Sequence, residues 1–216
     1  MIKKKTVILL LIFFTLLGTI ITFAGIGPYK HNDPITWSQS LDPYGRRGCG
    51  WHGRGINWAG NACLIYSMTY ATLKMDAMPP KCTDPYQLKE WSVDHGSPIV
   101  GREGYGNITN LKPCLRKGGH DVIHSISGKT KRMRFGKELS KFLYKYQQEN
   151  YITILCVQSC FAGCRHFICV DYVDTKKWDV RILNSARDDK AQDWLSKYDC
   201  TSPDLYEVWF IKVKKG

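Results

Sequence analysis

The stretch Gly60-Asn61-Ala62-Cys63-Leu64-Ile65-Tyr66-Ser67-Met68 predicts a turn that leads into a helix with a cysteine in its first turn. Gly60 and Asn61 are residue types typical of turns and helix N-caps. Further along, apolar side chains recur with helical spacing and predict one buried stripe, formed by Leu64, Met68, Ala71 and Met75. The helix is expected to end near residues 75–76, because two prolines that cannot continue it follow soon after.

A cysteine at the start of a helix lies among unpaired backbone N–H groups and at the positive end of the helix dipole. Both features favour the thiolate, which is the nucleophilic form of the side chain. Cys63 is therefore a candidate nucleophile. The alternatives for such a residue are a small core cysteine and one half of a disulfide.

The length of 216 residues fits one folded domain behind an export segment. Residues 1–5 carry three lysines, residues 6–23 are almost wholly apolar, and small residues precede a possible cleavage point after residue 24. The apolar run is nearly long enough to span a bilayer, so residues 1–24 are predicted to be a signal peptide or an N-terminal membrane anchor. We expect residues 25–216 to form a single exported domain that is secreted, periplasmic or attached to the cell surface.

Nine cysteines in an exported chain predict disulfides, and the odd number leaves one thiol over. Eight of them can form four bridges, and the ninth, for which Cys63 is the candidate, would remain a free thiol. The sequence does not give the connectivity, although Cys160 and Cys164 are spaced as a plausible local pair. A zinc site is the rival explanation, but the chain has no Cys-x2-Cys pair, so neither a metal nor another cofactor is expected.

The formal net charge of +12 includes the three lysines of the N-terminal segment, and without them it is 28 − 19 = +9. Outside a cell, such a charge favours contact with anionic envelope polymers or acidic lipid surfaces. Nucleic acid is not expected as a partner, because the basic residues are scattered and the densest run, residues 129–134, is short.

The order of predicted elements indicates an α+β fold. Residues 25–59 are rich in Gly, Pro, Asn, Asp and Trp and read as an irregular arm. Beyond the helix at Cys63, further helices are predicted over residues 86–93, 107–117 and 135–146. Strand-like runs cover residues 120–126, 151–157, 165–173, 178–183 and 205–213. The chain is thus predicted to place an N-terminal helical part, which carries the cysteine, on a C-terminal antiparallel sheet.

Cysteine catalysis also needs an imidazole and a group that orients it. Among the six histidines, His166 stands where a loop enters the buried strand that starts at Phe167. A side chain there projects over the edge of the sheet, whereas the other five histidines fit structural roles. The hairpin formed by residues 167–173 and 178–183 returns the chain beside its start, which places Asn184 close to His166. The side-chain oxygen of Asn184 is suited to accept the imidazole N–H and fix its tautomer.

Three segments carry a resemblance to a known family. Residues 60–68 resemble the nucleophile helix of the papain-like bacterial peptidases related to bacteriocin leader peptidases, the double-glycine peptidase-like group. Residues 163–172 are similar to the Gly-His-Phe strand of that group, and residues 180–186 to its strand ending in Asp-Pro, with Asn184 at the acidic position. The resemblance extends over roughly residues 30–190. The chain departs from the pattern at Ala62 and Leu64, where the group commonly has glycine, and at Arg165, which directly precedes His166.

The resemblance implies a papain-like cysteine peptidase, in which Cys63 attacks an amide carbonyl, His166 transfers the proton and Asn184 orients His166. The substrate would be a protein, a peptide or a peptidoglycan stem peptide. An oxyanion hole also needs a side-chain donor beside the backbone N–H of the nucleophile. Gln39 is the expected donor by residue type, with Asn32 and Asn57 as alternatives.

Two other functions fit the same sequence. The departures at Ala62, Leu64 and Arg165 favour a catalytically silent binding module, stapled by disulfides and attached to the cell envelope. An exported cysteine-hydrolase toxin also fits the size and the charge.

Overall fold

The computed structural model describes residues 62–99, 110, 113, 115–116, 122–128, 133–158, 165–185, 192–198 and 205–213. The predicted export segment at residues 1–24 and the candidate oxyanion donors Gln39, Asn32 and Asn57 lie outside these residues. Within the described part of the chain, no helix combines the length and the apolar character needed to cross a membrane.

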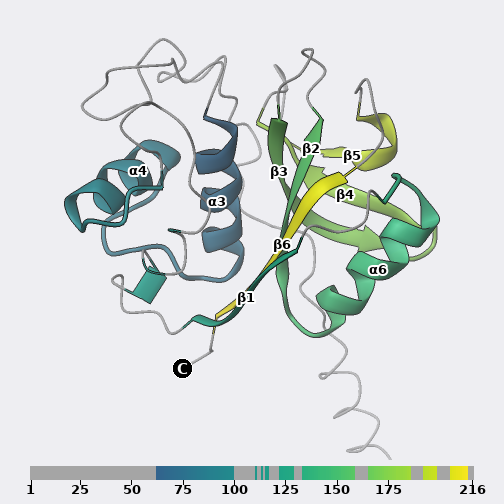
Figure 1. Cartoon of the computed structure of the whole chain (residues 1–216), viewed down its shortest axis with the longest axis horizontal. Helices are drawn as coiled ribbons and strands as arrows, with labels where there is room; N and C mark the ends of the chain where they lie inside the picture. Colours follow the sequence, from purple (N-terminus) through teal and green to yellow (C-terminus); the bar gives the residue numbers. More distant parts are fainter. Residues whose placement is uncertain are drawn as a thin grey trace, which may run out of the picture.

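The described chain is an α+β structure built on a six-stranded antiparallel sheet (Figure 1). Across the sheet the strand order is β1-β6-β2-β3-β4-β5. The strands are β1 (Val122–Gly128), β2 (Ile152–Gln158), β3 (Arg165–Asp174), β4 (Asp179–Leu183), β5 (Gln192–Trp194) and β6 (Leu205–Val213). The helices are α3 (Cys63–Lys74), α4 (Pro85–Asp94), α6 (Lys137–Gln148) and the short 3-10 helix η4 (Leu195–Lys197).

Helices cover both faces of the sheet, with α3 on one side and α6 on the other (Figure 1). Each face has its own apolar core, because successive side chains of a strand point to opposite faces. On β3, Phe167 and Cys169 join the core under α3, whereas Ile168 and Val170 join the core under α6. The strand that carries His166 is therefore packed from both sides.

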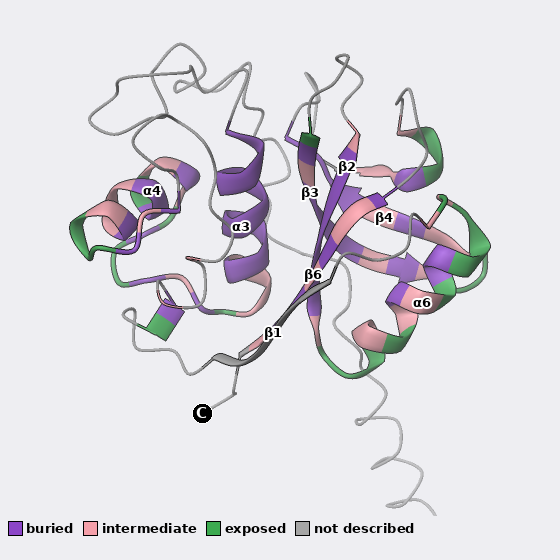
Figure 2. Ribbon diagram, in the orientation of Figure 1, coloured by how far each residue is buried: buried purple, intermediate pink, exposed green. Residues whose placement is uncertain are grey.

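Helix α3 is more deeply buried than the predicted stripe implies. All residues from Cys63 to Thr72 are buried, so the helix lies between the sheet on one side and α4 on the other (Figure 2). The next helix starts as its sequence predicts: Asp84 is the N-cap, its Oδ1 accepts from the backbone N–H of Gln87 at 2.8 Å, and Pro85 occupies the first turn. By contrast, α6 keeps an exposed outer face (Figure 2).

The predicted α+β layout is confirmed, with the cysteine in the first turn of the first described helix. Each predicted strand corresponds to an observed strand within a few residues, and α3, α4 and α6 match three predicted helices. Of the helix predicted over residues 107–117, only residues 110, 113, 115 and 116 are described. The sequence reasoning missed β5 and η4, because three residues are too few to show an alternating or helical pattern.

Four unpaired cysteines contradict the disulfide prediction. Cys63, Cys82, Cys156 and Cys169 are all free and buried. Four bridges would require eight paired cysteines among the nine, so the predicted set of four bridges with a single free thiol is wrong. The physical reason is that these side chains fill the interior as small apolar groups, a common role for an unpaired cysteine. The free thiol expected at Cys63 is present.

Thiol counting tests this correction. Under denaturing, non-reducing conditions, a maleimide mass tag is expected to modify at least four cysteines, and peptide mapping is expected to find tags on Cys63, Cys82, Cys156 and Cys169. Without denaturant the tag should react slowly at the same positions, because all four are buried. A single tagged cysteine in the denatured chain would instead support the four-bridge scheme.

Candidate active site

The sulfur of Cys63 lies at the open start of α3. The N-cap of the helix is Ala62, whose side chain makes no capping hydrogen bond. The side chain of Ala62 thus caps none of the backbone N–H groups at this end. Although burial raises the pKa of the Cys63 thiol, the backbone N–H groups of Phe167 on β3, of Leu64 and of Cys63 itself lower it. The sulfur is thus surrounded by donors from two elements, as a developing thiolate requires.

Burial nevertheless decides the resting state of this thiol. Cys63 is only 8% exposed, and the loss of water raises the pKa of the thiol above its ordinary value of 9.0, although the three backbone N–H groups lower it. The prediction that the helix start favours the thiolate identified real N–H donors but left out the cost of burial. At neutral pH the resting group is therefore a thiol, and a base must remove its proton.

His166 and Asn184 form a direct hydrogen bond. Nε2 of His166 lies 2.7 Å from Oδ1 of Asn184, and both residues are buried. The amide oxygen can only accept, so Nε2 carries the proton and Nδ1 holds the lone pair. Burial lowers the pKa of His166 from its ordinary value of 6.5, while the bond to Asn184 raises it. The resting imidazole is therefore neutral and available as a base at Nδ1.

The peptide between His166 and Phe167 connects this pair with the thiol. Burial raises the pKa of the Cys63 thiol, and one of the backbone N–H groups that lower it belongs to Phe167, whose nitrogen is bonded to the carbonyl carbon of His166. The start of α3 and the start of β3 therefore meet at one point. Among the described contacts, no hydrogen bond joins the sulfur to the imidazole itself. In the chain without substrate, the two residues are therefore connected only through the backbone of Phe167.

Tyr198 is a site residue that the sequence reasoning missed. Its ring is parallel to the imidazole of His166 at a centroid distance of 6.2 Å, and its hydroxyl donates to the carbonyl of Gln158 at 3.2 Å. Gln158 pairs with Arg165 across β2 and β3, so the tyrosine is tied to the strands beside the histidine. Tyr198 follows η4 in a segment without helical or alternating periodicity, so the sequence pattern gives no indication of its place beside His166.

Arg165, an unusual neighbour for His166, points toward β6. Its guanidinium lies 3.7 Å from a carboxylate oxygen of Glu207 and 5.3 Å from the ring centre of Tyr206. The side chain is 61% exposed. The arginine is thus a solvent-facing cation near the site, held by one acidic and one aromatic neighbour.

The described residues offer no group of three or more His, Cys, Asp or Glu side chains that could hold a metal ion. The candidate oxyanion donor Gln39 cannot be placed against this site, because it lies outside the described residues.

No protein-family model matches the chain, and no curated protein matches it by sequence. Among solved structures, the chain is similar to a double glycine motif protease from an AMS/PCAT transporter, determined in complex with its leader peptide. The identity is 17% and the TM-score 0.39, with 71% of this chain and 84% of that chain covered. It is also similar to the Pseudomonas avirulence protein AvrPphB, at 10% identity and a TM-score of 0.35, with 72% of this chain and 93% of that chain covered. At these values the likenesses by themselves assign neither activity nor substrate to the chain.

Proposed function

We propose that the chain is a papain-like cysteine hydrolase that cleaves amide bonds with Cys63, His166 and Asn184. The hydrogen bond between His166 and Asn184 supports this proposal most strongly, because it leaves the basic Nδ1 free one residue before Phe167, whose backbone N–H acts on the thiol of Cys63. The two resting groups are a neutral thiol and a neutral imidazole. That is the combination in which a general base takes the proton during attack.

In the proposed reaction, Nδ1 of His166 accepts the proton of Cys63 while the sulfur attacks the amide carbonyl carbon. The carbonyl π electrons move to the oxygen, and the backbone N–H of Cys63 donates to the resulting oxyanion. When the C–N bond breaks, the imidazolium returns the proton to the leaving amine, and a thioester remains on Cys63. His166 then takes a proton from water as the water attacks the thioester, which releases the acid and restores the thiol. Throughout these steps Asn184 holds Nε2–H and keeps the ring in one orientation.

The substrate that we propose is an amide bond in a peptide, a protein or a peptidoglycan stem peptide. The net positive charge of the chain favours work at an anionic envelope, and the apolar segment at residues 6–23 supports export or membrane attachment. A toxin would use the same chemistry on another target. The alternative of a silent module stapled by disulfides loses support, because Cys63 is a free thiol among backbone donors and three other cysteines are free as well.

The test is the release of new amino groups. The folded chain would be incubated with a combinatorial peptide library and, separately, with purified peptidoglycan, and new amino termini would be identified by mass spectrometry. We expect cleavage products from at least one of the two, and none from chain that has first been alkylated to completion with iodoacetamide. An absence of products from both substrates across the pH range in which the chain stays folded would overturn the proposal.

The pH dependence of kcat/KM provides a further prediction. Activity requires His166 as the neutral base and Cys63 as the proton-carrying thiol. Because burial lowers the pKa of His166 below 6.5 and raises that of Cys63 above 9.0, kcat/KM should stay level between these values. On the acid side it should fall only below pH 6.5, as His166 becomes protonated. A profile that already declines as the pH falls from 9.0 towards 6.5 would contradict the assignment of His166 as a neutral base.

A further inference from the structure

Strand β3 contains a β-bulge at Asp171, five residues beyond His166. Val170 pairs with Ile182, and Tyr172 pairs with Arg181. Between these two pairs β3 advances by two residues while β4 advances by one, so Asp171 is the extra residue of the bulge. Bulges are often found next to active sites, where they redirect side chains.

The bulge decides on which face of the sheet Asn184 lies. The turn between the strands fixes the pairs Asp174–Asp179 and Val173–Val180. If the register continued from there without a bulge, Ser185 would stand opposite Ile168, and Asn184 would point to the face away from it. With the bulge, the register that pairs Cys169 with Leu183 continues so that Asn184 stands opposite Ile168.

His166 shares a face with Ile168, because the two residues are two positions apart on β3. The bulge is therefore what brings Asn184 onto the face of the imidazole. The hydrogen bond of 2.7 Å between Asn184 and His166 depends on this single extra residue. A slip of one residue would move the amide to the opposite side of the sheet and leave Nε2 of His166 without its acceptor.

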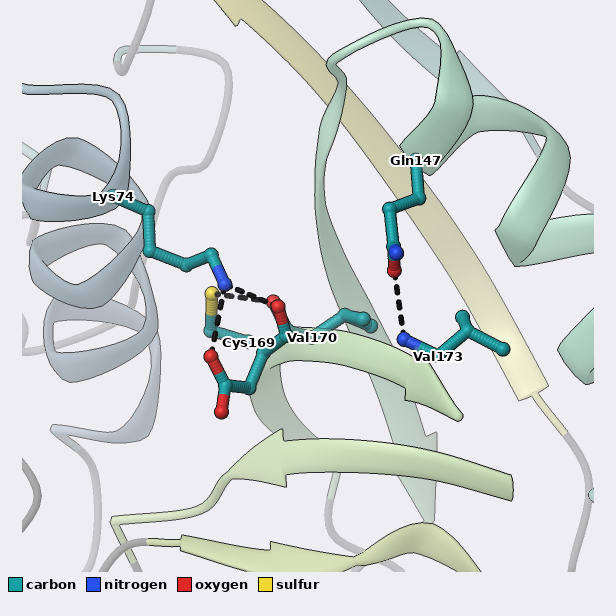
Figure 3. Close-up of polar contacts among 6 residues, drawn as sticks. Lys74, Gln147, Cys169, Val170 and Val173 are labelled. Atoms are coloured by element: carbon teal, nitrogen blue, oxygen red, sulfur yellow. Dashed lines mark hydrogen bonds and ion pairs between the residues drawn. The ribbon is translucent and has the colours of Figure 1, made fainter. Parts of the chain in front are cut away.

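Helix α3 holds this bulge through a buried ion pair. Nζ of Lys74 lies 2.9 Å from Oδ1 of Asp171 and also donates to the backbone carbonyl of the same residue. The side chains of Lys74 and Asp171 are 1% and 0% exposed. Figure 3 shows Lys74 extending from the helix to β3, beside Cys169 and Val170. One ammonium group thus binds both the backbone and the side chain of the bulge residue.

A second helix holds the strand from the other face. Oε1 of Gln147 on α6 accepts from the backbone N–H of Val173 at 2.7 Å (Figure 3). The carbonyl of the bulge residue Asp171 and the N–H of Val173, two residues further on, therefore bond to side chains of the two covering helices. A bulge disrupts the ladder locally, so such side-chain partners favour the bulged register over the continuous one.

We propose that Lys74 and Asp171 are positioning residues, which fix the β3 bulge and so set the orientation of His166 through Asn184. Lys74 belongs to the same helix as Cys63, so one helix carries the nucleophile at its start and fixes the geometry of the base from its end. The catalytic consequence rests on the proposed function, whereas the effect on the His166–Asn184 bond does not.

A stability role alone is a weaker explanation of this pair. Desolvation of two buried charges offsets much of their attraction, and apolar replacements of similar volume are often neutral or stabilising. An ion pair in this position instead selects one strand register, because only the bulged strand presents both the carboxylate and the carbonyl of Asp171 to the ammonium group.

The test uses Lys74→Met, with Lys89→Met as the matched control. Lys89 is also buried, at 1% exposure, but it lies on α4 and its Nζ bonds Glu90 at 2.6 Å, away from β3. In the chain labelled with 15N-histidine, the wild type should show His166 as the Nε2–H tautomer with a slowly exchanging proton. Lys74→Met should lose that signal and lower kcat/KM roughly 100-fold, the scale of a displacement of about 1 Å at a catalytic group. Lys89→Met should retain both.

If Lys74→Met does not fold, a double variant tests the same effect of the ion pair on the His166–Asn184 bond. Lys74→Met/Asp171→Leu removes both buried charges, so it should remain folded while losing the Nε2–H signal of His166. Retention of the signal and of wild-type kcat/KM in either folded variant would overturn the proposal. Loss of the signal in Lys89→Met as well would also overturn it, because the effect would then not be specific to Lys74. Failure of both Lys74 variants to fold would overturn it too, because the ion pair would then serve stability alone. An inactive wild type with the expected NMR result would refute only the proposed function.

Discussion

Replacing Cys63 with alanine is expected to lower kcat/KM for amide hydrolysis by about 10⁴-fold or more, which is the scale on which a nucleophile contributes to covalent catalysis. The variant loses the sulfur that forms the thioester but keeps the fold, because alanine fits the first turn of α3 and leaves its backbone N–H donors in place. The measurement is kcat/KM on a peptide that the wild type cleaves, with the folded state checked by circular dichroism.

Cys82→Ala is the control for this prediction. Cys82 is another buried free cysteine, but it precedes α4, and burial raises its pKa to about 11. The control should cleave the same peptide at the wild-type rate. If Cys63→Ala retained that rate, or if Cys82→Ala lost it, Cys63 would not be the nucleophile.

Replacing His166 with alanine is expected to reduce kcat/KM by roughly 10²- to 10⁴-fold, the usual range for the loss of a general acid–base group. The buried thiol then has no base to accept its proton, and its raised pKa keeps it protonated at neutral pH. The remaining activity should increase with pH towards the range where the thiol ionises by itself. The measurement is the pH dependence of kcat/KM for the variant and the wild type on the same substrate.

The matched control for this histidine is His95→Ala. His95 is exposed, follows α4 and stacks on Trp91 at a centroid distance of 3.9 Å. This replacement should leave the pH profile unchanged. An undiminished rate in His166→Ala, with the wild-type profile, would remove His166 from the mechanism.

The sequence predicted the sheet and the cysteine-bearing helix because their signals are local. Apolar runs separated by turn residues predict strands, and the Asp84-Pro85 start of α4 is a short-range signal. The proximity of His166 and Asn184 was also predicted, although the hairpin argument was incomplete. An unbroken hairpin would have placed the amide on the wrong face, and the bulge that corrects the register depends on Lys74, which is 97 residues from Asp171 in the chain. Such a long-range contact leaves no pattern in either segment.

The ionisation state of Cys63 was mispredicted for a related reason. The helix start and its N–H donors can be read from nine consecutive residues, but burial is set by the strands and helices that pack around the sulfur. Cys156 and Cys169 are also buried and free, whereas the count of nine cysteines predicts bridges there. Both errors came from properties that the assembled fold determines.

We propose that the sulfur of Cys63 and the imidazole of His166 act as one catalytic unit. The most direct test of this proposal is to react the folded chain with an activated acyl ester and to map the acyl group by mass spectrometry in the wild type and in His166→Ala. One thioester, on Cys63, is expected to form rapidly in the wild type and much more slowly without the imidazole. A thioester on another cysteine, or equal rates of thioester formation at Cys63 in the two proteins, would contradict this.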